Sequence, residues 1–174
     1  MKKIFALILI LNFLNINNSF ATKIGIIDVD KIIAESTAVI EIQKKVDAKK
    51  TSFESEINKK QSQLEADQKK LEDKKATLSQ SAFEKEVKNF EAKVEELKTN
   101  IDRKQNSLKK GSIEAMSKVQ DKLKMIINDL AKEKSLDLII PASQTLFAKD
   151  EFDITAEVLV ILNKKISKVD VKFE

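Results

Sequence analysis

The chain has no cysteine, histidine, tryptophan or tyrosine, only two glycines (Gly25 and Gly111) and a single proline (Pro141). The missing cysteine and histidine exclude disulfides, Cys/His zinc sites, and Ser-His-Asp or Cys-His catalytic triads. Two isolated glycines cannot build a glycine-rich phosphate-binding loop. Because the usual catalytic and cofactor-binding signatures lack their residues, we predict a protein that is not an enzyme and needs no cofactor or metal.

The residues that are present favour long helices. Charged residues make up 34% of the 174 residues and aromatic residues 5%, all of them phenylalanine. The stretch 34–134 contains one glycine and no proline, and its apolar residues are separated by Lys, Glu, Gln and Asp at helical spacing. Helices that are apolar on one side only and contain few aromatic residues form a thin hydrophobic core. We therefore expect contacts between subunits to supply much of the stability.

Residues 1–21 have the pattern of a secretory signal peptide. Lys2 and Lys3 precede an apolar run from Ile4 to Leu14, and Ser19-Phe20-Ala21 supplies small residues before a cleavage site. A membrane anchor is the alternative, but a spanning helix needs roughly 20 apolar residues. We predict export and cleavage after Ala21. Cleavage removes two of the 32 basic residues, which leaves 30 against 28 acidic residues.

Short strands are predicted at both ends of the mature chain. Residues 23–29 and 136–141 are rich in β-branched residues, and 144–148 is a third candidate strand. Asp28 or Asp30 can cap the helix after the first strand, and Asp153 can cap a short helix over 154–166. The alternating Val169, Val171 and Phe173 indicate a weak strand or a loose tail.

Residues 22–33 and 135–174 are therefore predicted to form a small β-rich base. So small a sheet exposes its edges, and pairing with copies of the same chain would cover them. The apolar residues of the two clearest strands are the candidates for oligomerisation: Ile24, Ile26, Leu138, Ile139 and Ile140.

The stretch 34–134 is predicted to form an antiparallel helical hairpin, a coiled-coil arm that turns near residues 79–82. Its first helix runs from about residue 30 to residue 78. Ser81 and Glu84 have the spacing of a capping box, and the heptad phase breaks at the same place. The alternative is one continuous helix of about 100 residues, roughly 150 Å long.

The two helices of this hairpin differ in how apolar their facing sides are. We call the side of each helix that faces the other the seam. In the seam of the first helix Leu64 and Leu71 recur every seven residues, but the remaining positions hold Lys60, Asp67 and Lys74. The return helix has a full apolar seam, so we expect Leu71 near Asn89 and Phe90, and Leu64 near Glu96 and Leu97. The seam is thus half polar. The seam positions of the return helix are Phe83, Val87, Phe90, Val94, Leu97 and Ile101.

Gly111 marks a second irregularity. The heptad pattern slips by a four-residue step just after it, and glycine weakens helices. We predict a hinge at Gly111.

Basic residues gather in the return helix. The segment from Lys98 to Lys124 holds eight basic and three acidic residues. Such a surface suits acidic clients, or the phosphates of lipopolysaccharide or lipid head groups. The alternative is a solvated helix face rich in lysine. Nucleic acid is disfavoured, because no stacking aromatics accompany the basic residues. The candidates for anion contact are Arg103, Lys104, Lys109 and Lys110.

Three blocks of the mature chain give it a resemblance to the Skp/OmpH family of periplasmic chaperones. They are the strand at 23–29 leading into Glu35-Ser36, the arm of alternating charge, and the closing block of 136–141 followed by Asp-Ile-Thr-Ala-Glu-Val-Leu at 153–159. The resemblance covers the whole mature chain. Familiar members are more strongly basic, and the tail 164–174 runs past where some members stop.

The resemblance implies a periplasmic homotrimer. Strands of three copies would form a β-barrel body, and three helical tentacles would enclose a cavity that holds unfolded outer-membrane proteins without ATP. A lipopolysaccharide site in a comparable basic region is also implied.

The fold class is therefore predicted as α+β, with a long helical hairpin on a small β-rich oligomerisation base. The predicted function is a holdase that prevents outer-membrane proteins from aggregating before insertion. The alternative is a structural coiled-coil spacer or adaptor of a cell-envelope complex.

Overall fold

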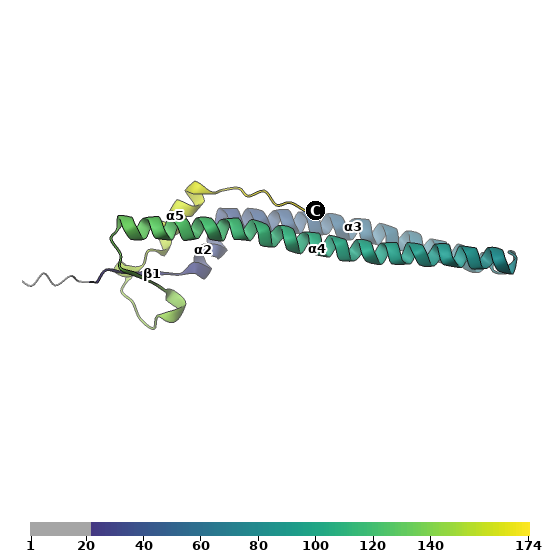
Figure 1. Ribbon diagram of the computed structural model, residues 1–174, viewed down its shortest axis with the longest axis horizontal. Helices are drawn as coiled ribbons and strands as arrows, with labels where there is room; N and C mark the ends of the chain where they lie inside the picture. Colours follow the sequence, from purple (N-terminus) through teal and green to yellow (C-terminus); the bar gives the residue numbers. More distant parts are fainter. Residues whose placement is uncertain (1–21) are drawn as a thin grey trace, which may run out of the picture.

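Two long helices that lie side by side and run in opposite directions dominate the fold (Figure 1). The computed structural model describes residues 22–174, and the predicted signal peptide lies outside these residues. Helix α3 spans Thr37–Lys74 and helix α4 spans Gln80–Glu133. The predicted helical hairpin is confirmed, and the alternative of one continuous helix is wrong.

The turn of the hairpin lies at residues 75–79, slightly earlier than the predicted 79–82. Helix α4 begins directly after Ser79, whose hydroxyl accepts a backbone N–H of the first turn at 3.4 Å. Ser81 already lies inside that turn, and Glu84 accepts a hydrogen bond from a glutamine side chain at 2.8 Å. The cap predicted at Ser81 therefore lies two residues too far along the chain. A serine at either position offers the same hydroxyl to the helix, so the sequence did not distinguish the two.

The helix predicted from residue 30 to residue 78 is interrupted at Ser36. Helix α2 spans Val29–Glu35 and is capped by the carboxylate of Asp28. Ser36 is extended and fully buried. The backbone N–H of Thr37 then donates to the side-chain oxygen of Asn163 at 2.9 Å, which satisfies one of the unpaired donors at the start of α3. This break is absent from the sequence pattern, because its acceptor lies 126 residues further along the chain.

Two of the predicted strands are confirmed. Strand β1 (Ile24–Ile27) and strand β2 (Leu138–Pro141) pair in parallel, with Ile24 opposite Leu138. The hairpin lies between them in the sequence, as a parallel pair requires a long crossover. On the other side of β1, residue 26 makes an isolated bridge to Asp153. Within residues 22–174, β2 has a strand partner on one side only.

The third predicted strand, at 144–148, is wrong. The chain forms a short 3-10 helix η1 (Ala142–Gln144), a stretch without regular structure, and a second 3-10 helix η2 (Asp150–Phe152). Thr145 donates its N–H to one upstream carbonyl at 3.0 Å and its hydroxyl to another at 3.1 Å. These local hydrogen bonds use groups that a strand would need for pairing.

Helix α5 (Thr155–Lys165) is attached to the end of β1 by its first residues. The hydroxyl of Thr155 accepts the backbone N–H of Asp28 at 2.9 Å, and the N–H of Ile154 donates to the carbonyl of Ile26 at 2.9 Å. Asp153 accepts the N–H of Thr155 at 2.8 Å. Hydrogen bonds from Thr155, first from its side chain and then from its backbone, hold the pKa of Asp153 below its ordinary value. The Asp-Ile-Thr block thus fixes α5 against the sheet.

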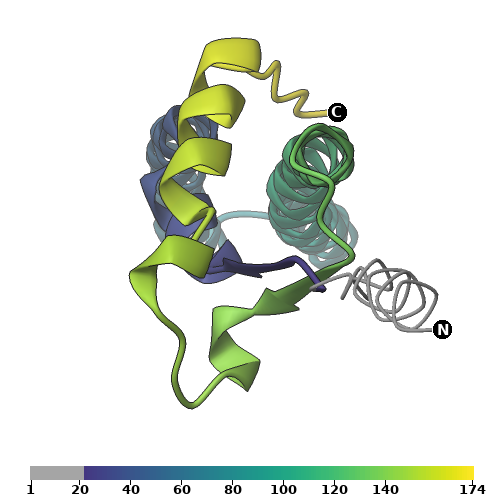
Figure 2. The ribbon, with the colours of Figure 1, turned by 90° about the vertical axis from the view of Figure 1, so that its left-hand side faces the viewer.

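The hydrophobic core lies at the base, where α2, α5 and the sheet meet the near halves of α3 and α4 (Figure 2). Its fully buried side chains come from all four of these helices. Toward the tip the burial thins: Phe53 is the last buried residue of α3, and Leu97 is the buried residue of α4 nearest the turn. The largest fully buried hydrophobic side chains are Ile32, Val119, Ile126, Leu130, Val158 and Leu162.

Candidate functional site

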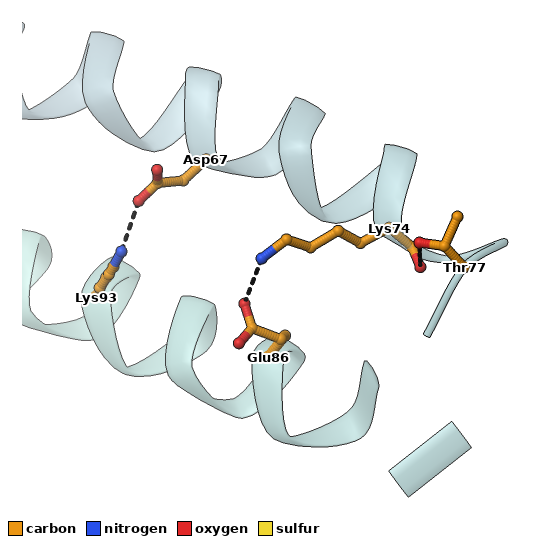
Figure 3. Close-up of polar contacts among 5 residues, drawn as sticks. All are labelled: Asp67, Lys74, Thr77, Glu86 and Lys93. Atoms are coloured by element: carbon orange, nitrogen blue, oxygen red, sulfur yellow. Dashed lines mark hydrogen bonds and ion pairs between the residues drawn. The ribbon is translucent and has the colours of Figure 1, made fainter. Parts of the chain in front are cut away.

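The outer half of the hairpin is joined by charged side chains. Four ion pairs cross from α3 to α4, and Figure 3 shows the two nearest the turn, Asp67 with Lys93 and Lys74 with Glu86. Most of these side chains are exposed to solvent, so the pairs are individually weak; the exception is Lys104, whose side chain is only 16% exposed. The pairs and their N–O distances are Glu56–Lys104 at 2.7 Å, Lys60–Glu96 at 3.4 Å, Asp67–Lys93 at 2.6 Å and Lys74–Glu86 at 3.3 Å.

These pairs explain the polar seam of the sequence. The positions that broke the apolar pattern, Lys60, Asp67 and Lys74, each find an opposite charge on α4. The hydrogen bond from Lys93, and then its charge, lowers the pKa of Asp67; the hydrogen bond to Asp67, and then its charge, raises the pKa of Lys93. Both groups are therefore charged at neutral pH.

Between these pairs the seam is open. A hollow of about 370 Å³ is floored by Leu64 and Leu97 and rimmed by the charged groups around them. A second hollow, of about 220 Å³, contains Leu71 and Phe90. The predicted pairing of Leu64 with Leu97, and of Leu71 with Phe90, is thus consistent with the structure. Small apolar floors with charged rims offer weak contact points for side chains of another chain.

The basic candidates do not form one site. Arg103, Lys109 and Lys110 line a single hollow of about 520 Å³, together with Glu174 at the end of the chain. Lys104 points to the other helix, where its ammonium pairs with Glu56 and lies 3.9 Å from the centre of the Phe53 ring. The hydrogen bond from Lys104, and then its charge, lowers the pKa of Glu56. The structure thus brings three of the four candidates together and gives Lys104 a role in holding the hairpin.

Gly111 has a packing role that its position in the sequence does not reveal. Helix α4 runs through it without a break, and the residue is buried. A Cβ at this position would collide with the backbone carbonyl oxygen of Lys172, and it would lie 3.3 Å from the ring of Phe173. The close approach of the chain's last segment requires a glycine here. The predicted hinge concerns motion and stays a prediction.

The candidate oligomerisation residues come together in the small sheet, but they differ in how exposed they are. Ile26 is buried within the protomer, Ile24, Ile139 and Ile140 are partly buried, and Leu138 is half exposed. Sequence reasoning missed the most exposed apolar residues nearby, Leu146 and Phe147, whose exposed fractions are 107% and 84%. They were missed because residues 144–148 were predicted to form a strand, which would have placed the two side chains on opposite faces.

No helix within residues 22–174 is both long enough and apolar enough to cross a membrane. The same part of the chain holds no group of three or more metal-ligating side chains.

Comparisons with known proteins agree with this architecture. A protein of Aquifex aeolicus (strain VF5) without a described function is 32% identical over 164 residues, which cover 94% of this chain and 98% of that protein. The crystal structure of a candidate OmpH-like outer membrane chaperone from Caulobacter crescentus CB15 has a similar fold. Its TM-score is 0.81 at 18% sequence identity, over 88% of this chain and 91% of that chain.

The family comparison covers both ends of the hairpin. Residues 23–162 match the family described as Outer membrane protein (OmpH-like), which includes β1, both long helices, β2 and most of α5. The resemblance predicted from the strand at 23–29 and the block at 153–159 is confirmed. The chain belongs to the OmpH-like family.

Proposed function

We propose that this protein is a periplasmic chaperone that holds unfolded outer-membrane proteins and prevents their aggregation before membrane insertion, without ATP. Membership of the OmpH-like family supports a chaperone-type role. The observation that carries the holding mechanism is the outer half of the hairpin, where exposed ion pairs and open hollows replace a closed apolar seam. An arm built in this way keeps contact surface available for another chain.

Holding would depend on many weak contacts. Charged rims and small apolar floors such as Leu64 and Leu97 offer shallow binding places along the arm. Several arms that act on one client raise the local concentration of such places, while each contact remains reversible. Release follows when the client reaches its folded state in the membrane, because that state has the lower free energy. No nucleotide is needed for this cycle.

The oligomer would be built from the base, residues 22–33 and 135–174, and the outer part of the arm 34–134 would project from it. The pairing of β1 with β2 leaves one side of β2 without a strand partner within residues 22–174. Leu138, Leu146 and Phe147 provide exposed apolar surface close to this sheet. A homotrimer closed through these residues would surround a cavity with three hairpins.

The hollow lined by Arg103, Lys109 and Lys110 is the proposed contact for anionic groups of clients or of lipopolysaccharide. Lys104 is left out of this proposal, because its charge is already paired with Glu56.

The test uses the chain from residue 22 to residue 174. Light scattering after gel filtration gives its mass, and dilution of a urea-unfolded outer-membrane β-barrel protein into it gives its effect on turbidity. We expect a trimer that suppresses aggregation in the absence of ATP. A monomer that leaves turbidity unchanged would contradict the proposal. An oligomer that leaves turbidity unchanged would favour the spacer or adaptor alternative.

A further inference from the structure

The last segment of the chain, residues 166–174, runs along the hairpin (Figures 1 and 2) and contacts both long helices, α3 at Lys45 and α4 at Gly111. We call this segment the tail, and the surface that it covers between these two contacts the groove. Its side chains alternate: Val169 is only 4% exposed, Val171 and Phe173 are partly buried, and the charged residues between and after them are exposed. Val169 belongs to the main hydrophobic core and Val171 packs against it. The tail is therefore ordered by the groove without forming a strand.

The closest contacts of the tail use its backbone. The ammonium of Lys45 on α3 donates to the carbonyl oxygen of Val169 at 2.8 Å. The carbonyl of Lys172 fits into the notch at Gly111 on α4, where any side chain would collide with it. Every extended segment has such carbonyls at this spacing. The groove therefore demands an extended backbone and apolar side chains at alternate positions, and it demands little else of the sequence.

The far end of the groove is incompletely filled. The hollow there contains Ser107, which is 5% exposed and whose hydroxyl has no hydrogen-bond partner among residues 22–174. Arg103, Lys109 and Lys110 surround it, and the tail offers them Glu174, whose carboxylate lies 3.7 Å from the ammonium of Lys110. A buried polar group without a partner, next to basic side chains, suits a more polar or more acidic occupant.

We propose that this groove is a binding site for an extended client segment with apolar residues at alternate positions and an acidic residue at its basic end, and that the tail occupies it as an internal competitor. The inference rests on the proposed holding function and assigns one site to it. Transmembrane strands of outer-membrane barrels alternate apolar and polar residues, so an unfolded client carries many segments of this kind. The tail lies beyond the matched residues 23–162, so this competitor is a feature of this chain beyond the family match.

A tethered competitor has a measurable effect on a free ligand. A segment joined to its site by a short linker has an effective concentration in the millimolar range. A free peptide with similar contacts must displace it, so the peptide binds the intact chain more weakly than a chain without the tail. The expected difference is about tenfold or more.

The probe is a fluorescein-labelled peptide with the sequence of residues 166–174, measured by fluorescence anisotropy. We expect a chain that ends at Ser167 to bind it at least about tenfold more tightly than the intact chain does. Gly111→Ala in the shortened chain should weaken binding by about tenfold, because the new methyl group fills the notch. Ser117→Ala, an exposed position on the same helix, is the matched control. A peptide of the same composition with its apolar residues placed together should bind worse.

Equal peptide affinity of the intact and shortened chains overturns the proposal, and so does binding that Gly111→Ala leaves unchanged. Circular dichroism checks that the shortened chain is folded. If it is not, Val171→Asp in the intact chain loosens the tail while Val169 remains, and the same rise in affinity is expected. The turbidity assay with an unfolded β-barrel protein separates the two proposals. If the chain suppresses aggregation but does not bind the peptide, only the proposal of a binding site in the groove is wrong. If no variant suppresses aggregation, the proposed holding function is wrong.

Discussion

Gly111 is a glycine in the middle of a long helix, and the tail determines what its replacement does. In an exposed helix, Gly→Ala is expected to stabilise by about 1 kcal/mol. In the intact chain the added methyl group would collide with the Lys172 carbonyl. We expect Gly111→Ala to stabilise a chain that ends at Ser167, and to be neutral or destabilising in the intact chain.

Urea unfolding at one fixed protein concentration measures both effects, since an oligomer's stability depends on concentration. The two backgrounds should differ by about 1 kcal/mol or more. Ser117→Ala should have the same small effect in both. If Gly111→Ala stabilises both chains equally, the tail does not lie on Gly111 in solution.

Ser135 adopts a backbone conformation that usually belongs to glycine. Its φ is 53°, in the left-handed region. The N–H of Ser135 bonds to the carbonyl of Lys132 at 3.1 Å, and that of Leu136 to the carbonyl of Ala131 at 2.8 Å, which together close the end of α4 in a Schellman motif. We expect Ser135→Gly to stabilise the fold by about 1 kcal/mol, because the strain of a side chain at this φ is removed.

Thermal unfolding at a fixed protein concentration would show this gain as a higher midpoint. Ser135→Ala is the matched control and should bring no gain, since alanine has the same strain. A midpoint that falls in Ser135→Gly would mean that the serine side chain contributes more than its backbone strain costs.

The ion pairs of the hairpin predict how the stability of the arm depends on pH. Asp67 has a lowered pKa, so its contribution is complete above the ordinary value of about 3.9 and is lost as the pH falls through the folded value. Lys93 has a raised pKa, so its contribution is complete below about 10.4 and is lost as the pH rises through the folded value. The pair therefore stabilises across the neutral range and weakens in acid.

Asp67→Asn tests this at the outer hairpin. The difference in unfolding free energy between the native chain and this variant should be constant between about pH 6 and pH 8 and should shrink below about pH 4. High salt should reduce it at every pH, because exposed charges are screened. Asp73→Asn is the control, since Asp73 has no ion-pair partner among the described residues. A difference that persists unchanged in acid would mean that the Asp67 carboxylate is not the source of the effect.

The hairpin could be predicted from the sequence because its packing repeats along the chain. The facing of Leu64 with Leu97 follows from heptad spacing and one turn, both of which are local. The break at Ser36 and the glycine at 111 could not be explained in this way, because their partners, Asn163 and Lys172, come from the far end of the chain. The candidate site was predicted only in part, because its arrangement also depends on residues far away in the sequence. Neighbouring basic residues were found, but their division between two faces depends on Glu56 and the tail.

The proposed assembly depends on surface that the protomer does not use. Leu146 and Phe147 are among the most exposed apolar residues described, so the change of both to aspartate should not affect the packing of a single protomer. If they lie between subunits, buried charges would oppose association. We expect Leu146→Asp with Phe147→Asp to lower the mass of the assembly in solution while the helical circular dichroism is retained.

Light scattering after gel filtration gives the mass. Val160→Asp is a suitable control, because Val160 is an exposed apolar residue of α5 that lines a hollow beside α4 and not the loop. It should leave the mass unchanged. If the loop variant keeps the mass of the native chain, the loop of residues 142–153 lies outside the interface between subunits.

Three of the crossing ion pairs restrict how the arm can change in length. Their partners are separated by 12, 26 and 48 residues and share one midpoint, Gln80. Removal of residues from one helix alone would shift every pair nearer the base out of register. Removal of seven residues from each helix at matching positions would keep the pairs aligned and the apolar seam in phase. The arm can therefore be lengthened or shortened only in paired steps of one heptad, each worth about 10 Å of reach. The depth of an enclosure made from such arms, and with it the size of the chain it can surround, would vary in those same steps.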